Sequence, residues 1–201
     1  MNDFDFDFEF DFGGGVNELD INAICKEMTR SERIVFDLAQ GTRQLKYLLR
    51  DFDENKDYRF LSNGKGFSSI NFIDWVCNSF GEIEQLYCST LGVGKKHILY
   101  LNELPIKHAH FVVGNIFEES KIIQEYGYYS TFANICKEKG WTFSAAKNHS
   151  KILLMKTKQK FFVLEGSGNL NDNPKIEQFC FMCDKSLYLW YEKFFKALKQ
   201  C

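Results

Sequence analysis

The sequence lacks most of the features that would assign a chain to a specialised class. Its 25 basic and 27 acidic residues give a net charge of −2, so no global positive field indicates a nucleic-acid-binding protein. Seven cysteines are scattered from Cys25 to Cys201, without the dense framework of small secreted domains. No stretch approaches the roughly 18 uncharged apolar residues of a membrane span, and no basic segment followed by an apolar run marks a signal peptide. These absences predict a soluble protein of a reducing compartment, the cytoplasm.

What the sequence does contain is enough apolar material for one ordinary domain with a short appendage. Apolar residues make up 45% of the 201 positions and aromatic residues 16%, which excludes disorder throughout the chain. Composition and pattern divide the chain into an acidic tail (1–15), an N-terminal helical region with a loop (16–66) and an α/β domain (67–201). The tail holds five acids and no base, so residues 16–201 carry 25 basic residues against 22 acidic ones.

The tail alternates acidic residues with phenylalanine from Asp3 to Phe12 and ends in Gly13-Gly14-Gly15. Strict alternation is typical of a two-faced strand, whereas low complexity before a glycine hinge is also typical of a disordered tail. The tail is therefore either an arm that adds to a partner's sheet or docks on a basic groove, or a solvated segment without a binding role.

Hydrophobic periodicity predicts helical structure from Thr29 to Leu49, a polar loop over 51–66 and a short helix capped by Ser68 or Ser69. Strands then alternate with helices. Strands are expected over 83–89, 108–115, 141–146, 150–156, 161–165 and 176–182, and helices over 95–104, 118–139 and 186–198. The last helix is expected to bury Leu187, Trp190, Tyr191, Phe194 and Phe195. This order predicts a mixed β-sheet flanked by helices, with an N-terminal helical extension.

The most informative segment begins at His149-Ser150-Lys151 and reaches Gly166-Ser167-Gly168-Asn169 after two apolar strands. Residues two apart on a strand share a face, so His149 and Lys151 should project together, as should Ser167 and Asn169. If the two strands are neighbours, an imidazole, an ammonium, a hydroxyl and an amide converge at one end. Such groups suit a phosphate oxyanion, and Gly166 and Gly168 would let backbone amides approach it.

Lysines are concentrated in the same segment. Between Trp141 and Leu164 there are five lysines and no acid: Lys147, Lys151, Lys156, Lys158 and Lys160. A lysine run is also typical of a solvated strand edge. Together with the polar groups, however, it predicts a positive patch for a polyanion, with Lys147, Lys156 and Lys158 as binding residues.

The order His149-x-Lys151, apolar strand, Gly166-Ser167-x-Asn169 and then Glu177 resembles the single catalytic motif of the phospholipase D superfamily, H-x-K-x4-D-x6-G-S-x-N. The resemblance extends over about residues 82–199 and implies a phospholipase D-like fold. The sequence departs from the pattern in two ways. Lys156 stands where the family has aspartate, and the interval from Lys156 to Gly166 is three residues longer than in the family motif. The family aspartate has a supporting role, so the reactive groups themselves are present.

The resemblance implies a metal-independent mechanism without a cofactor. His149 would attack phosphorus and form a phosphohistidine that water resolves. Lys151, Asn169 and the Gly168 amides would stabilise the phosphate oxygens, with Ser167 in support, and Glu177 would orient a histidine. A second histidine must protonate the leaving group, and only His149 has the motif around it. A homodimer that joins two copies of His149 supplies both roles.

Three other patterns are better explained by a structural role than by a metal-binding or phosphate-binding site. His108 and His110 share a strand face, but no second ligand pair accompanies them, so they are not expected to bind a metal. Cys180 and Cys183 lie three apart on a strand and should point to opposite faces as core residues. The Gly92–Lys96 segment lacks the rest of a phosphate-binding P-loop and reads as a loop into a helix.

Two functions remain. The first is a phosphodiester hydrolase, most plausibly a nuclease, because no interfacial apolar surface indicates a lipid substrate. The alternative is a non-catalytic nucleic-acid-binding or assembly module that keeps a phosphate pocket, and Lys156 and the longer interval favour it.

Overall fold

A computed structural model describes residues 25–26, 33–36, 41–62, 67–115, 128–171 and 175–198. Its strands are β1 (Cys25–Lys26), β2 (Arg33–Phe36), β3 (Asp57–Ser62), β4 (Gln85–Thr90), β5 (Ala109–Gly114), β6 (Thr142–Ala146), β7 (Ile152–Lys156), β8 (Phe161–Gly166) and β9 (Glu177–Cys183). Its helices are α1 (Gly41–Leu48), α2 (Ser69–Phe80), α3 (Lys95–Glu103), α6 (Tyr128–Lys139) and α7 (Lys185–Leu198). No helix in the described ranges is both long and apolar enough to cross a membrane.

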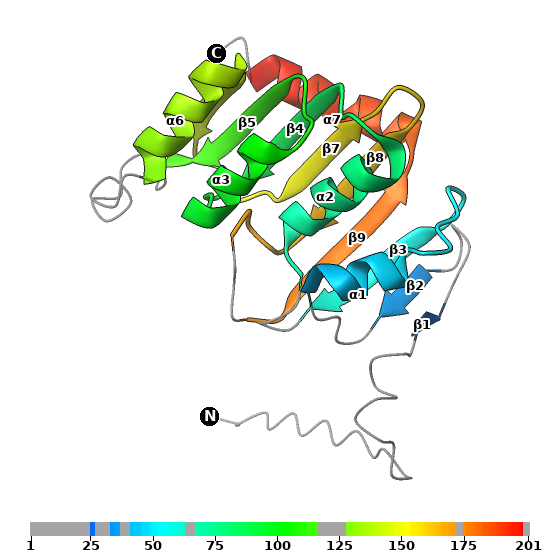
Figure 1. Ribbon diagram of the computed structural model, residues 1–201. Helices are drawn as coiled ribbons and strands as arrows, with labels where there is room; N and C mark the ends of the chain where they lie inside the picture. Colours follow the sequence, from blue (N-terminus) through cyan, green and yellow to red (C-terminus); the bar gives the residue numbers. More distant parts are fainter. Residues whose placement is uncertain are drawn as a thin grey trace, which may run out of the picture.

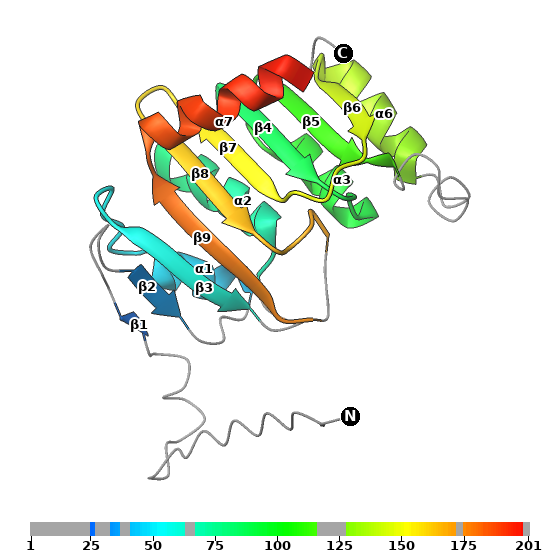
Figure 2. The same cartoon turned by 180° about the vertical axis from the view of Figure 1, so that it is seen from behind.

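All the described strands belong to one mixed sheet, in the order β1-β2-β3-β9-β8-β7-β4-β5-β6 (Figure 1). Strands β4, β5 and β6 are parallel to one another and β2 is parallel to β3, whereas the pairs β4–β7, β7–β8, β8–β9 and β9–β3 are antiparallel. Helices cover both faces of the sheet (Figures 1 and 2). The predicted mixed α/β fold is therefore confirmed.

The sheet has two edges at the ends of its strands, and we name them for the parallel strands. The carboxyl edge is where β4, β5 and β6 end, and the amino edge is where they begin. Because β7 is antiparallel to β4, with Ser89 opposite Ile152, β7 begins at the carboxyl edge. The tight β7–β8 turn lies at the amino edge, where Lys156 pairs with Phe161, and β8 returns to end at the carboxyl edge.

Aromatic side chains form much of the core between the sheet and the four helices α1, α2, α3 and α6. Phe60, Phe72, Phe162 and Phe181 each have 2% or less of their surface exposed. The rings of Phe162 and Phe181 stack on neighbouring strands with centroids 5.6 Å apart, and Phe72 of α2 lies 5.3 Å from Phe181. Full burial of each such ring stabilises the fold by about 1.5–3 kcal/mol. This rigid layer holds the ends of β7, β8 and β9 in place.

Helix α7 is the only described helix on the other face, and it packs there through a narrower stripe than expected. Tyr188 and Phe195 are buried with 1% and 0% exposure, but Trp190 is 63% exposed and Phe194 47%. The expectation for Phe195 is confirmed, and the expectation that Trp190 and Phe194 are buried is wrong. Helical residues advance about 100° each, so Trp190 lies about 200° around the helix from Tyr188 and faces away from the sheet.

The N-terminal region contains more strand than its periodicity predicted. The periodicity predicts that Ile34 and Val35 lie in a helix, but they lie in β2. The segment 51–66, expected as a loop, contains β3, which hydrogen-bonds with β9. The alternation of β3 is hidden among polar neighbours, yet Tyr58 and Phe60 are 1% and 2% exposed. The acidic tail 1–15 lies outside the described residues, and the three-part division of the chain stays a prediction.

Candidate functional site

His149 and Lys151 lie at the carboxyl edge, in the connection that leads from β6 into β7. The Lys151 Nζ atom is 2.8 Å from His149 Nδ1 and 2.5 Å from the His149 carbonyl oxygen. The His149 ring is exposed, whereas Lys151 is half-buried. The structure thus brings these two side chains together, as their spacing predicted.

Asn148 anchors this segment, and the sequence analysis did not single it out. Its amide nitrogen donates to the carbonyl oxygens of Thr90 and Val112, at 3.1 and 2.9 Å. Its amide oxygen accepts from the backbone nitrogen of Ser150 at 3.0 Å and from the Ser89 hydroxyl at 3.2 Å. Asn148 and Ser150 alternate with His149 and Lys151, so the polar pair that faces the ends of β4 and β5 fixes the positions of the other two residues. That alternation is the signal that could have identified Asn148.

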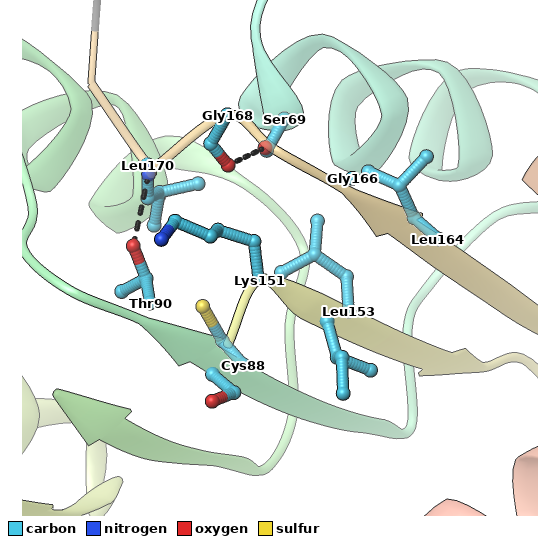
Figure 3. Close-up of a pocket in the computed structure, with 11 residues that line it drawn as sticks. Ser69, Cys88, Thr90, Lys151, Leu153, Leu164, Gly166, Gly168 and Leu170 are labelled. Atoms are coloured by element: carbon cyan, nitrogen blue, oxygen red, sulfur yellow. Dashed lines mark hydrogen bonds between the residues drawn. The ribbon is translucent and has the colours of Figure 1, made fainter. Parts of the chain in front are cut away.

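A small hollow lies beneath the Lys151 side chain (Figure 3). It has a volume of about 10 Å³, which holds about one water-sized group. The ammonium of Lys151 points toward Thr90 and Leu170 across this hollow. A single phosphate oxygen fits such a space, and the rest of a phosphodiester would remain at the surface beside His149.

Cys88 also lines the hollow and is fully buried. Burial raises the pKa of its thiol far above the usual range, which keeps the sulfur protonated. A protonated thiol is a poor nucleophile. Cys88 is therefore a poor candidate for a nucleophile at this site.

The glycine-containing loop after β8 is attached to two other elements at the carboxyl edge. The Ser69 hydroxyl, in the first turn of α2, donates to the Gly168 carbonyl at 3.1 Å, and the Leu170 amide donates to the Thr90 hydroxyl at 3.1 Å (Figure 3). A Cβ atom on Gly166 would lie 2.7 Å from the Gln178 carbonyl oxygen, and one on Gly168 would lie 2.8 Å from the Phe179 ring. Close packing against β9 therefore requires both glycines.

Ser167 and Asn169 diverge, contrary to the expectation that they project together. The loop leaves the strand after Gly166, so the two-residue alternation no longer applies. Ser167 donates to the Glu177 carboxylate and accepts from the Gln178 amide at 3.0 Å. The Asn169 oxygen accepts from the Leu91 amide at 3.0 Å. No described residue accepts from the Asn169 side-chain nitrogen, which leaves its donors for an oxyanion.

The electrostatics of the site centre on Lys151. Burial lowers the pKa of its ammonium, and the negative charge of Glu177 partly offsets that shift. A lysine ammonium only donates hydrogen bonds, so His149 Nδ1 accepts and the ring proton sits on Nε2. In this resting arrangement the Nε2 atom carries no free lone pair. An anion that attracts the ammonium would release Nδ1 and allow the proton to move there.

The lysines of the segment do not form one patch. Lys147 lies beside His149 at the carboxyl edge and is exposed. Lys156 lies at the amino edge, where its Nζ atom pairs with Glu84 at 2.9 Å, and Lys158 lies in the adjoining turn. Lys160, also at the amino edge, pairs with Glu54. The expectation that Lys156 and Lys158 join the phosphate site is corrected by the course of the β7–β8 hairpin.

The position of Lys156 also bears on the missing aspartate of the resembled motif. Strand β7 separates Lys156 from Lys151 by five residues, or about 16 Å at 3.3 Å per residue. A side chain at position 156 therefore cannot contact the groups around His149 within this chain.

The other three histidines occupy different surroundings. His110 is buried, with Nδ1 2.8 Å from the Thr142 hydroxyl, and the exposed His108 precedes β5 at the amino edge. His97 lies in the first turn of α3, near the carboxyl edge, with Nε2 3.2 Å from the Ser68 hydroxyl, and is 4% exposed. No described histidine other than His149 is exposed at the carboxyl edge.

Two further expectations can be compared with the structure. Cys180 and Cys183 pack against the hydrophobic clusters on opposite faces of the sheet, as predicted for core residues. The loop after β4 leads into α3, which begins at Lys95 after Gly94, so the prediction of a loop entering a helix is confirmed.

No protein-family model matches the sequence, and no curated protein matches it. Among solved structures, the chain is similar to polyphosphate kinase from Porphyromonas gingivalis, with a TM-score of 0.54, 12% identity and coverage of 72% of this chain. It is also similar to the archaeal chromatin protein TrmBL2 (TM-score 0.45, 11% identity, 79% of this chain and 59% of that one) and to yeast tyrosyl-DNA phosphodiesterase (TM-score 0.35, 12% identity, 51% and 26%).

The likeness to polyphosphate kinase concerns the fold alone, and the chain spans only 26% of that enzyme's length. The mixed α/β fold expected from the sequence thus agrees with that of a solved structure.

Proposed function

We propose that this protein is a metal-independent phosphodiester hydrolase, and that its substrate is a nucleic acid. The observation that carries the proposal is the contact of 2.8 Å between Lys151 Nζ and His149 Nδ1, at an exposed sheet edge. A nucleophile and a cation are thereby adjacent, and the hollow beneath Lys151 is large enough for only one phosphate oxygen. A long polymer lying over the surface meets this geometry without needing a deep pocket.

The reaction has two displacements. When the phosphate attracts Lys151, the His149 proton moves to Nδ1 and the Nε2 lone pair attacks phosphorus. The P–N bond forms as the P–O bond to the leaving alcohol breaks, and a second histidine, which acts as an imidazolium protonated on both ring nitrogens, donates a proton to that oxygen. Water then attacks phosphorus, gives a proton to the second histidine and breaks the P–N bond. The products are a phosphomonoester and an alcohol, and both histidines return to their starting states.

Neighbouring groups support the charge that develops on the phosphate. Lys151 and the side-chain nitrogen of Asn169 would donate to the non-bridging oxygens in the transition state. Ser167 holds Glu177, whose charge lies close enough to act on Lys151. These contacts favour a role for Glu177 in holding the ammonium in place, in addition to the role toward a histidine that the resemblance implies.

The second histidine is proposed to be His149 of a second copy. His97 is buried, and neither His108 nor His110 lies at the exposed carboxyl edge. A two-fold axis near His149 would place two equivalent imidazoles around one phosphorus atom. Mixing parent protein with an excess of His149→Ala protein should then lower activity below the value for simple dilution. Activity that follows dilution alone would contradict a shared site and direct attention to His97.

The proposal is tested by incubating the full chain with single-stranded DNA, duplex DNA, RNA and a chromogenic phosphodiester in EDTA. We expect cleavage of at least one substrate by the parent protein and its loss in His149→Gln. The matched control is His108→Gln, which removes an exposed histidine from the amino edge and should retain full activity. Equal cleavage by His149→Gln and the parent would refute the mechanism.

A second function is favoured by the resting tautomer of His149. With Nδ1 occupied by Lys151, the site in its present state binds an anion more readily than it attacks one. A non-catalytic nucleic-acid-binding or assembly module would therefore bind the same substrates in the EDTA assay and leave all of them intact. Binding that depends on Lys151, without cleavage, is the result that would establish this alternative.

A further inference from the structure

A second and larger hollow lies on the opposite face of the sheet from the Lys151 site. Its volume is about 370 Å³, within the range of small-molecule sites. Its walls come from β3, β8 and β9, next to the part of this face that α7 crosses (Figure 2). The proposed phosphodiester site makes no use of it.

Strand register explains why a hollow forms there. Arg59 of β3 lies directly opposite Cys180 of β9, and Cys180 lies directly opposite Glu165 of β8. Directly opposite residues point to the same face, so these three side chains form a row across three strands. The short central cysteine makes the floor, and the long arginine and glutamate make the walls. Leu61 and Gln178 form the next row toward the carboxyl edge.

The guanidinium of Arg59 has unused hydrogen-bonding capacity in this hollow. Its Nε atom is buried and has no hydrogen-bond partner, and no carboxylate in the described residues forms an ion pair with Arg59. The carboxylate of Glu165 accepts a hydrogen bond from the Tyr191 hydroxyl of α7 and does not pair with Arg59. A buried donor without an acceptor destabilises the fold, and an anion in the hollow would supply the missing acceptor.

We propose that this hollow binds a small organic anion. Its phosphate or carboxylate group contacts Arg59, since the planar guanidinium matches both groups with paired hydrogen bonds. Its apolar part lies over Cys180 and Leu61, and the exposed amide of Gln178 borders the opening. The site lies on the other face from His149 and stands independently of the phosphodiesterase proposal.

The probes are phenyl phosphate, benzoate and the neutral phenol, titrated calorimetrically into the full chain. The titrated protein is the Lys151→Ala variant, so that the Lys151 site contributes little to the binding of these anions. We expect saturable binding of at least one anion with one molecule per chain, and no saturation with phenol. Adding Arg59→Gln should weaken that binding at least tenfold. Cys180→Leu, which fills the floor, should weaken it as well.

The matched control is Arg50→Gln, which removes an exposed arginine that pairs with Asp51 at 3.0 Å. Its anion affinity should equal that of the Lys151→Ala protein, and thermal melts should show that each variant is folded. Undiminished affinity in Arg59→Gln, or no saturation by either anion, would overturn the proposal. Neither result bears on phosphodiester cleavage, so the two proposals fail separately.

Discussion

The two edges of the sheet receive lysines from one short stretch of sequence and surround them differently. At the amino edge, Lys156 pairs with Glu84 and Lys160 with Glu54. At the carboxyl edge, Lys151 contacts an imidazole and a carbonyl oxygen, and Lys147 is exposed. Exposed ion pairs contribute little to stability, and they also neutralise the cation. Five lysines that are close in sequence therefore do not make one patch when a hairpin separates them.

The largest expected difference between the two edges comes from truncating one lysine at each end of β7. Lys151→Ala should lower the rate of phosphodiester cleavage by about 10²–10³-fold, because it removes a donor placed at developing charge. Lys156→Ala should change the rate less than twofold, since its partner is Glu84 at the far edge. Steady-state rates of both variants at saturating substrate give the answer, and equal losses would mean that the edges do not differ.

The fold could be predicted from the sequence where periodicity was strong. The strands from β4 to β9 and helices α2, α3 and α7 follow from runs of apolar residues with turns between them. Strand β3 could not be found in this way, because its alternation of Tyr58 and Phe60 with polar residues resembles a polar loop until β9 pairs with it. The exposure of Trp190 and Phe194 depends on the width of the contact between α7 and the sheet, and local sequence patterns do not predict that width.

The site was predictable only for residues close in sequence. His149 and Lys151 come together because two-residue spacing determines it locally. The split of the lysine run could not be foreseen, since it depends on where the β7–β8 turn falls relative to the edges. The divergence of Ser167 and Asn169 depends on long-range contacts with Glu177 and Leu91, which are set by the whole fold.

Asn148 offers a second test, because it supports the carboxyl edge from a half-buried position, whereas His149 is exposed. Asn148→Ala should lower the free energy of unfolding by about 1–3 kcal/mol, since the carbonyl groups of Thr90 and Val112 lose their donor. Asn78→Ala is the control, because Asn78 is exposed and makes one bond, to Asp74 at 2.8 Å. That variant should stay within about 0.5 kcal/mol of the parent in urea unfolding. An unchanged midpoint in Asn148→Ala would contradict the anchoring role.

Salt dependence distinguishes the edges in binding. If Lys147 contacts a phosphate of single-stranded nucleic acid, Lys147→Gln should reduce the slope of log affinity against log salt by about 0.7. Lys158→Gln removes an exposed lysine at the amino edge and should leave the slope unchanged. Fluorescence titrations of a labelled oligonucleotide at several salt concentrations measure both. A larger change in slope from Lys158→Gln than from Lys147→Gln would place the nucleic acid at the amino edge and contradict the proposed site.

The pH dependence of binding gives the smallest expected effect. Because burial lowers the pKa of Lys151, its charge is present at lower pH and disappears earlier than that of an exposed lysine as pH rises. Affinity for a phosphodiester should therefore begin to fall below the pH at which ordinary lysines titrate. In Lys151→Arg this alkaline decline should vanish, because the guanidinium stays charged. Lys147→Arg should leave it in place, and an identical decline in all three proteins would exclude Lys151 as its source.

The central claim is that His149 forms a covalent bond to phosphorus while Lys151 holds the phosphate. It is tested most directly by rapid alkaline quench of the protein during turnover of a ³²P-labelled phosphodiester in EDTA, followed by peptide mass spectrometry. Phosphohistidine survives alkali, so the account predicts a labelled peptide modified at His149 and no label in His149→Gln. Turnover in EDTA without any label on the chain, or with label on another residue, would contradict it.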